Sequence, residues 1–165
     1  MDPRPPSQSV SHITRWMGIA QANTAGNVHG GEIMRMCDEV AGIAAIRHSG
    51  SRVVTAGMDR MTFLHPVFVG MLVTVAASVN ASWRSSMEVG VRVEAENIHT
   101  GEVTHTSTAY LTMVALDADG RPTAVPRVDA QTSSEQRRLR EAEHRRTTRL
   151  REREEIVQAR GAARE

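Results

Sequence analysis

The chain has 165 residues, of which 40% are apolar and 24% are charged, and its formal net charge is +1. This length suits one globular domain with a tail, and no apolar run approaches the roughly 18 residues of a membrane span. The chain contains no lysine, which excludes a Schiff-base lysine and a phosphate-loop lysine, and its few aromatic residues argue against a nucleic-acid-binding surface.

The two ends of the chain differ in composition from the middle. Residues 1–9 are rich in Pro and Ser and lack the apolar core of a signal peptide, so we predict a disordered N-terminus there. Residues 131–165 hold 10 Arg and 7 acidic residues, whereas residues 1–130 hold 10 Arg and 12 acidic residues. We therefore predict a folded domain over 10–130 and an Arg/Glu-rich helical tail over 131–165.

A strand is expected over residues 12–19, followed by a small, polar loop that ends at Val28. Residues 30–47 then carry apolar side chains at 33, 36, 37, 40, 43, 44 and 46, which is the rhythm of a helix, and Gly50 is a plausible stop signal. The other side of this helix is also mostly small or apolar from Val40 onward. We therefore expect the helix to be buried nearly all round.

The chain beyond residue 52 is typical of strands. Residues 52–63, 71–83, 87–97 and 103–116 are rich in Val, Thr, Met and Ala, and turn residues separate them. Strands 71–83 and 87–97 are expected to pair as a hairpin around residues 84–86. The sequence therefore predicts an α+β fold, with an antiparallel sheet wrapped around a long central helix.

A charged helix should follow, capped by Ser133 or Ser134 and supported by ion pairs at helical spacing, such as Glu141 with Arg145. Its apolar residues are few, so we expect a solvated helix. A helix that bridges subunits, or a weak coiled coil, is the alternative.

The loop before the central helix carries the chemistry. A Gly30-Gly31 pair at a helix start leaves backbone N–H groups unpaired beside the positive end of the helix dipole, which suits an oxyanion. Asp38 lies about 11 Å further along the helix, so it cannot act on an oxyanion held there. If two chains laid their helices antiparallel, Asp38 of one would approach Asn27 and Gly31 of the other. Burial of this carboxylate would raise its proton affinity, which suits a general base.

These residues resemble a known family. The segments GNVHGG at 26–31 and MCDEVAG at 36–42 are similar to the signature of hotdog-fold cytosolic acyl-CoA thioesterases, the brain acyl-CoA hydrolase group. Three later segments, VVTA at 53–56, FLHP at 63–66 and SSMEV at 85–89, also resemble that family. The resemblance implies a hotdog fold and hydrolysis of fatty acyl-CoA in a homo-oligomer, either a dimer or a trimer of dimers.

The resemblance also implies site residues, with Asn27 and Asp38 acting together across a dimer interface. Asn27 would orient the water or the thioester, and Asp38 would be the general base or, as the lesser alternative, a nucleophile. The Gly31 N–H, with Gly30, would hold the thioester oxygen, while His29 would bind substrate or shape the loop. Three residues at the strand turn could meet coenzyme A phosphates, namely Arg84, Ser85 and Ser86.

Purely structural roles remain an alternative for several of these residues. Asp38 and Asn27 could be a helix residue and a loop residue with purely structural roles, and Cys37 is expected in the core. The seven histidines show no metal-binding spacing, so we expect no metal and no cofactor. Because Cys37 is the sole cysteine, we expect a reducing compartment and a cytoplasmic protein. The alternative functions are a non-catalytic acyl-CoA-binding module and a hotdog dehydratase.

Overall fold

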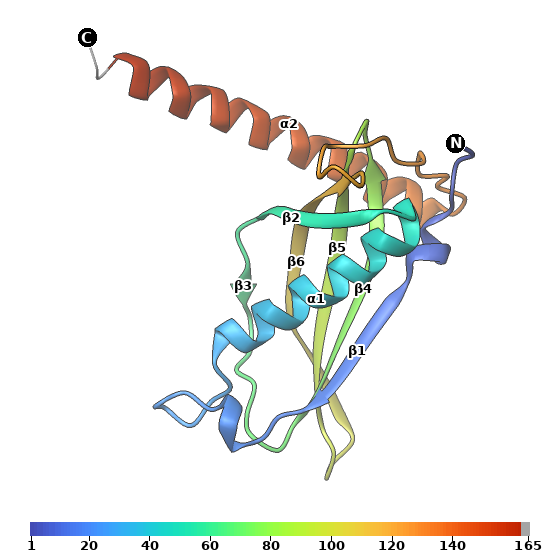
Figure 1. Cartoon of the computed structure of the whole chain (residues 1–165). Coiled ribbons are helices and arrows are strands. Elements are labelled where there is room, and N and C mark those ends of the chain that lie inside the picture. Colours follow the sequence, from blue (N-terminus) through green and yellow to red (C-terminus); the bar gives the residue numbers. More distant parts are fainter. Residues whose placement is uncertain (163–165) are drawn as a thin grey trace. The chain divides into compact units, whose positions relative to one another are not determined.

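The computed structural model describes residues 1–162, which form two compact units, Met1–Asp129 and the segment from Ala130 onward. Each unit is described by itself. The first unit holds one long helix and six strands (Figure 1). In chain order its elements are a short 3-10 helix η1 (Pro6–Ser9), β1 (Ser11–Trp16), a second 3-10 helix η2 (Ile19–Gln21), α1 (Gly30–Ser49), β2 (Arg52–Met58), β3 (Thr62–Phe63), β4 (Leu72–Ser82), β5 (Ser86–Asn97) and β6 (Glu102–Leu116).

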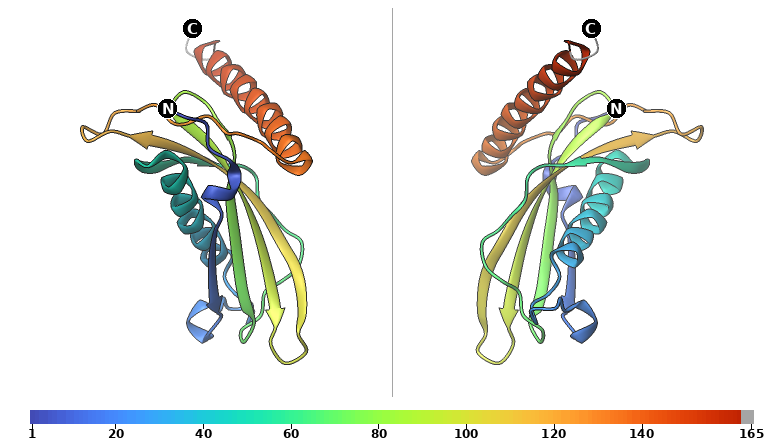
Figure 2. Two further views of the ribbon diagram at one scale, coloured as in Figure 1. Left: turned by 90° about the vertical axis from the view of Figure 1, so that its right-hand side faces the viewer. Right: turned by 90° about the vertical axis from the view of Figure 1, so that its left-hand side faces the viewer.

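The strands form one antiparallel sheet in the order β1-β4-β5-β6-β2, and β3 pairs with β6. Strands β4 and β5 form the hairpin that the sequence predicts, and β1 and β2 are the two edges. The sequence places one strand over 52–63, but the structure divides it into β2 and a two-residue β3. The sheet curls around α1, which lies on one of its faces (Figure 2). The predicted α+β architecture is confirmed.

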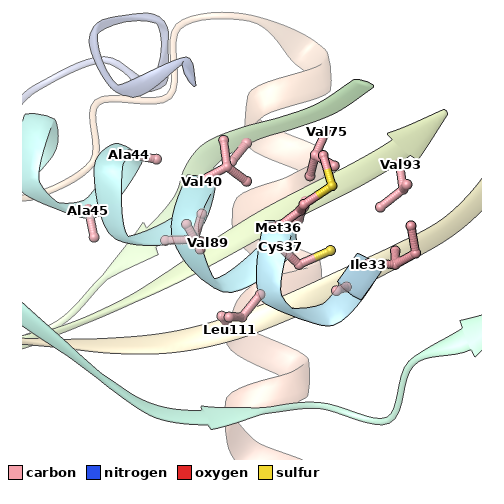
Figure 3. Close-up of a cluster of buried hydrophobic side chains, with 14 of the residues drawn as sticks. Ile33, Met36, Cys37, Val40, Ala44, Ala45, Val75, Val89, Val93 and Leu111 are labelled. Atoms are coloured by element: carbon pink, nitrogen blue, oxygen red, sulfur yellow. The ribbon is translucent and has the colours of Figure 1, made fainter. Parts of the chain in front are cut away.

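The core lies between α1 and the concave face of the sheet. Alternate residues of β5, such as Val89 and Val93, are fully buried against α1 (Figure 3). The helix contributes fully buried side chains at helical spacing, including Met36, Cys37 and Val40. It ends at Gly50, whose φ of 71° is the left-handed conformation that glycine adopts readily at a helix C-terminus.

One prediction about α1 is wrong. The helix was expected to be buried nearly all round, yet its outer face is open in the single chain. Met34, Ile43 and Ile46 are 42%, 39% and 49% exposed. The physical reason is that the curled sheet covers only one side of the helix, so the apolar outer face requires some other cover.

The N-terminal segment differs from the predicted disorder. Pro6–Ser9 form the short helix η1, and Ser9 is fully buried. The Ser9 hydroxyl accepts a hydrogen bond of 2.9 Å from the backbone N–H of Val79. The Arg4 guanidinium donates to the backbone oxygen of His48 at 2.8 Å, near the end of α1. Composition alone misses these long-range contacts, because they depend on where β4 and α1 end.

The second unit contains α2 (Ser133–Ala162), as the sequence predicts. The predicted cap at Ser133 or Ser134 is wrong, because the cap is Thr132. The Glu135 N–H donates to the Thr132 hydroxyl at 3.2 Å, and the Glu135 carboxylate accepts from the Thr132 N–H at 2.9 Å. This reciprocal pair is a capping box. None of the helices described here is both long and apolar enough to cross a membrane.

Candidate active site

The loop between β1 and α1 is organised by the Asn23 side chain. Its carbonyl oxygen accepts hydrogen bonds from the backbone N–H of Ala25 at 2.9 Å and of Asn27 at 3.1 Å. The backbone of Asn27 returns a bond, since its oxygen accepts from the Asn23 N–H at 2.7 Å. Gly26 supplies the positive φ, 82°, that the turn requires. The Asn23 carbonyl is thus used within the loop, while its NH₂ group is a potential donor to a ligand.

The same loop is tied to the segment that precedes β4. The Val28 N–H donates to the Val67 oxygen at 2.8 Å, and Asn27 forms a β-bridge with Phe68. Val28 and Val67 are both buried. Asn27 is half-buried at the mouth of this arrangement. The backbone around both asparagines is therefore fixed before α1 begins.

The start of α1 is capped by a histidine. The Nδ1 atom of His29 accepts a hydrogen bond of 2.9 Å from the Gly31 N–H, so the ring closes the first turn. A Cβ on Gly31 would lie 2.9 Å from that nitrogen, so a larger residue here would displace the imidazole from its capping position. The predicted oxyanion donor is therefore already bonded within the chain. The Gly30 N–H, the first of the helix, has no acceptor within α1.

Asp38 lies on the exposed face of α1, where its partner is a threonine. The Thr55 hydroxyl of β2 donates a 2.5 Å hydrogen bond to Asp38 Oδ1 and also lies 3.5 Å from Met113 Sδ. The sequence predicts a buried carboxylate, which is wrong for the single chain because Asp38 and Thr55 are both exposed. The pair stands at the edge of the sheet, since β2 is an edge strand. The open side of this edge is where a second chain could supply the missing groups.

Asp38 and the start of its own helix remain apart. Seven residues separate Gly31 from Asp38, which is about 10 Å along a helix. Between them, Arg35 bridges Glu32 at 2.9 Å and Glu39 at 2.5 Å on the outer face. The hydrogen bond from Arg35 lowers the pKa of Glu32. Within one chain, the Asp38 carboxylate and the loop before α1 therefore lie apart from each other.

The turn at residues 84–86 lies at the other end of the sheet. It joins the end of β4 to the start of β5, whereas the loop that bridges to Phe68 lies next to the start of β4. The eleven residues of β4 separate the two ends by roughly 30 Å. Arg84, Ser85 and Ser86 therefore cannot join Asn27 and Gly31 within one chain. The prediction that they bind the same substrate requires another chain.

Cys37, next to Asp38 in sequence, points into the core as predicted. It is fully buried in the single chain. Burial, together with the nearby Asp38 carboxylate, raises the pKa of its thiol to about 12. A thiol in this state is neutral and shielded, so it cannot be the nucleophile of the site.

Comparison with known proteins identifies the family. Residues 25–102 match the family model described as the thioesterase superfamily. Protein VdlD of Helicobacter pylori is 40% identical over 130 residues, which cover 79% of this chain and 74% of that protein. A crystal structure of an apo-hexameric acyl-CoA thioesterase matches with a TM-score of 0.89 and 36% identity, over 92% of this chain and 97% of that one. The chain belongs to the acyl-CoA thioesterases.

Two further acyl-CoA thioesterases bear on the site. The acyl-CoA hydrolase of Staphylococcus aureus, solved with butyryl coenzyme A and coenzyme A, matches with a TM-score of 0.89 and 31% identity, over 98% of this chain and 99% of that one. Alanine variants of one Asp, one Asn and one Thr of that enzyme have also been solved. The cytosolic acyl coenzyme A thioester hydrolase of Rattus norvegicus is 32% identical over 87% of this chain, but this chain spans only 38% of it.

Sequence reasoning missed two residues that the structure places at the candidate site of this acyl-CoA thioesterase. Thr55 lies within the VVTA segment that supports the resemblance, but strand alternation alone gives no sign that it reaches Asp38. Asn23 begins the polar loop, and Asn followed by Ala-Gly two residues later is a turn signal that could have singled it out. Both residues are identified by their hydrogen bonds.

Proposed function

We propose that the protein hydrolyses acyl-CoA thioesters to a free fatty acid and coenzyme A. The observation that carries this proposal is the Asp38 carboxylate, held by the Thr55 hydroxyl at an open sheet edge. A carboxylate at such an edge is available to a ligand and to a second chain. Membership of the acyl-CoA thioesterases supports the choice of substrate.

Asp38 acts as the general base. It takes a proton from water, the oxygen of that water attacks the thioester carbonyl carbon, and the C–S bond breaks. Coenzyme A leaves as a thiolate and recovers the proton. Because a thiolate is a good leaving group, strong acid assistance is unnecessary. Thr55 holds the carboxylate in one orientation and is a positioning residue.

The spacing of the Staphylococcus aureus variants supports Asn23 over Asn27 as the catalytic amide. In that enzyme the Asp follows the Asn by fifteen residues, and the Thr follows the Asp by seventeen. The same intervals join Asn23, Asp38 and Thr55 in this chain. We therefore assign to Asn23 the orienting role that the sequence suggested for Asn27. Asn27 remains the second amide of the loop, beside the bound thioester.

The thioester oxygen binds at the start of α1. The Gly31 N–H is the proposed donor, so the oxygen takes the place of His29 Nδ1 and the imidazole turns aside. The Gly30 N–H can add a second bond, since α1 offers it no acceptor. The helix dipole favours the negative charge that develops there.

A complete site takes one half from each of two chains. Asp38 of one chain faces the Asn23 loop and Gly31 of the other, which the axial distance within one helix requires. A homodimer is the smallest such assembly, and a trimer of dimers fits the hexameric relative. In such an assembly, Arg84, Ser85 and Ser86 from a further chain can reach the phosphates of coenzyme A. The reaction uses water alone, without metal or cofactor.

We place this activity in the cytoplasm. The sole cysteine is buried and forms no disulfide, which suits a reducing compartment. The cytosolic rat relative supports the same location. Fractionation of the cells that make the protein, followed by immunoblotting, tests this assignment.

Thiol release from acyl-CoA substrates of four to sixteen carbons tests the function. Wild-type protein should release coenzyme A, and Asp38→Ala should lower kcat by at least about 100-fold with little change in KM. An absence of hydrolysis at every length, with acyl-CoA still bound, would indicate a binding module. Conversion of enoyl-CoA to hydroxyacyl-CoA would indicate a dehydratase.

Mixing two inactive variants tests the two-chain site. When Asp38→Ala and Asn23→Ala chains are co-expressed and pair at random, about half of the dimers are mixed. Each mixed dimer has one intact site of two, so about a quarter of wild-type activity should return. If the mixture stays inactive although mixed oligomers form, the site lies within one chain.

A further inference from the structure

A buried hydroxyl near the start of α1 has no hydrogen-bond partner among residues 1–162. Ser107 in β6 is fully buried, and within the described residues its Oγ atom makes no hydrogen bond. Its neighbours at alternate positions, Ala109 and Leu111, belong to the core, so the Ser107 side chain faces the same side. A buried polar atom without a partner is rare and calls for an explanation.

Phe63 of β3 lies directly across from this hydroxyl. Phe63 and Ser107 are paired residues of β3 and β6, so their side chains stand on the same face, about 5 Å apart at Cβ. The Phe63 ring also lies against the first residue of α1, because a Cβ on Gly30 would be 3.3 Å from its Cζ atom. Figure 1 shows β3 beside the start of that helix. The ring therefore stands between the helix start and the Ser107 hydroxyl.

The Phe63 ring is placed to move. The Phe63 side chain is 45% exposed, whereas its paired residue Ser107 is fully buried. Strand β3 has only two residues, and in the part of the chain that the structure describes it pairs with β6 alone. Few contacts hold such a segment, which places it at the low-stability end of a fold.

We propose that Phe63 is the residue that limits the length of the acyl chain. This inference rests on the proposed function, in which the thioester oxygen binds the N–H groups of Gly30 and Gly31. An acyl chain attached to that carbonyl meets the Phe63 ring first. The ring closes the path toward Ser107, so the wild-type protein selects short acyl chains. A chain that passes the ring reaches the Ser107 hydroxyl, which favours a hydroxyl or keto oxygen over a methylene.

The test is the profile of kcat/KM against acyl length, from four to sixteen carbons. The kcat/KM of the wild-type protein should decline beyond short acyl chains. Phe63→Ala should raise kcat/KM for the longer substrates at least about tenfold. Phe63→Trp should shift the preference toward still shorter chains. Ile98→Ala, which removes an equally exposed side chain from the β5–β6 turn, is the matched control and should keep the wild-type profile.

The Ser107 hydroxyl is tested within Phe63→Ala. The added Ser107→Ala substitution should further raise kcat/KM for long unsubstituted acyl chains. It should also remove any preference for 3-hydroxyacyl chains of equal length. If Phe63→Ala fails to fold, Phe63→Leu and Phe63→Trp should move the profile in opposite directions. If the wild-type protein hydrolyses acyl-CoA and every Phe63 variant keeps the wild-type profile of kcat/KM against acyl length, this inference is overturned but the proposed function is not. A wild-type protein that hydrolyses no acyl-CoA overturns the proposed function as well.

Discussion

The Thr55 hydroxyl and the Asp38 carboxylate are joined by a 2.5 Å hydrogen bond that links edge strand β2 to α1. Seventeen residues separate the two in sequence. A hydrogen bond to a charged group is among the stronger ones in proteins, and it fixes which oxygen of the carboxylate is free. Asp38 Oδ1 is the bonded atom, so Oδ2 is the oxygen available for the proposed role as general base.

Removal of that hydroxyl should reduce turnover without loss of binding. Thr55→Val keeps the shape of the side chain, and a bond worth about 1.5–3 kcal/mol predicts a kcat roughly 10- to 100-fold lower. Thr55→Ser, which retains the hydroxyl, is the control and should stay near wild type. Steady-state kinetics on one acyl-CoA substrate measure both variants. Equal loss in Thr55→Ser and Thr55→Val would show that the hydroxyl is irrelevant.

The two asparagines of the loop should differ in their effect on catalysis. Asn23→Asp retains an oxygen for the turn but loses the NH₂ donor, so kcat should fall at least about tenfold while the fold survives. Asn27→Ala should cost less, because its observed bonds come from the backbone. Circular dichroism checks the fold of each variant. A larger loss in Asn27→Ala than in Asn23→Asp would restore the assignment suggested by the sequence.

The Cys37 thiol should be inert in the native protein. Burial raises its pKa to about 12, so at pH 8 almost no thiolate is present and no reagent can reach it. We expect dithionitrobenzoate to label no thiol in the native state and one per chain in guanidinium. Iodoacetamide should leave hydrolysis unchanged. Rapid native labelling that abolishes activity would contradict both the burial and the excluded nucleophile.

Stability should fall in mild acid because of His48. Its Nε2 bonds the oxygen of Pro126 at 3.0 Å and must carry the proton, while its buried Nδ1 has no partner among the described residues. Burial, aided by the Arg4 charge, lowers the pKa of His48. Below about pH 6.5 the unfolded chain therefore binds a proton that the folded chain refuses. The free energy of unfolding should be flat above this pH and decrease below it.

Urea unfolding between pH 5 and 8 measures the effect, which is limited to about 1.4 kcal/mol per pH unit for one proton. His48→Gln keeps a donor for Pro126 and should flatten the dependence. His99→Gln, at an exposed turn, is the matched control and should preserve the wild-type slope. A slope that is the same in all three proteins would assign the acid sensitivity to other groups.

The order of elements was predictable because it depends on local periodicity. The buried spacing of Met36, Cys37 and Val40 shows in the sequence, as does the glycine that ends α1. The alternation of apolar and polar side chains along β5 is equally clear in the sequence, since Val89 and Val93 face the core while Arg92 faces solvent. The edges of the sheet were not predictable, because they depend on which strands meet.

The site was only partly predictable for the same reason. Asp38 stood out as a charge on an apolar helix, but its partner Thr55 lies on a strand whose position no local pattern defines. The bond between His29 and Gly31 depends on a ring orientation, so the sequence shows a free donor where the fold has a bonded one. Arg84 resembled a substrate contact until the length of β4 separated it from the loop.

Strand β2 carries Thr55 and is also the open border of the sheet. The proposed two-chain site therefore makes quaternary structure and turnover difficult to evolve independently. In the proposed two-chain site, a substitution on β2 that alters how another copy docks there would also shift the Thr55 hydroxyl that orients the Asp38 carboxylate. Substitutions that gradually change how the subunits pack should consequently lower the rate of hydrolysis before they cause the oligomer to dissociate.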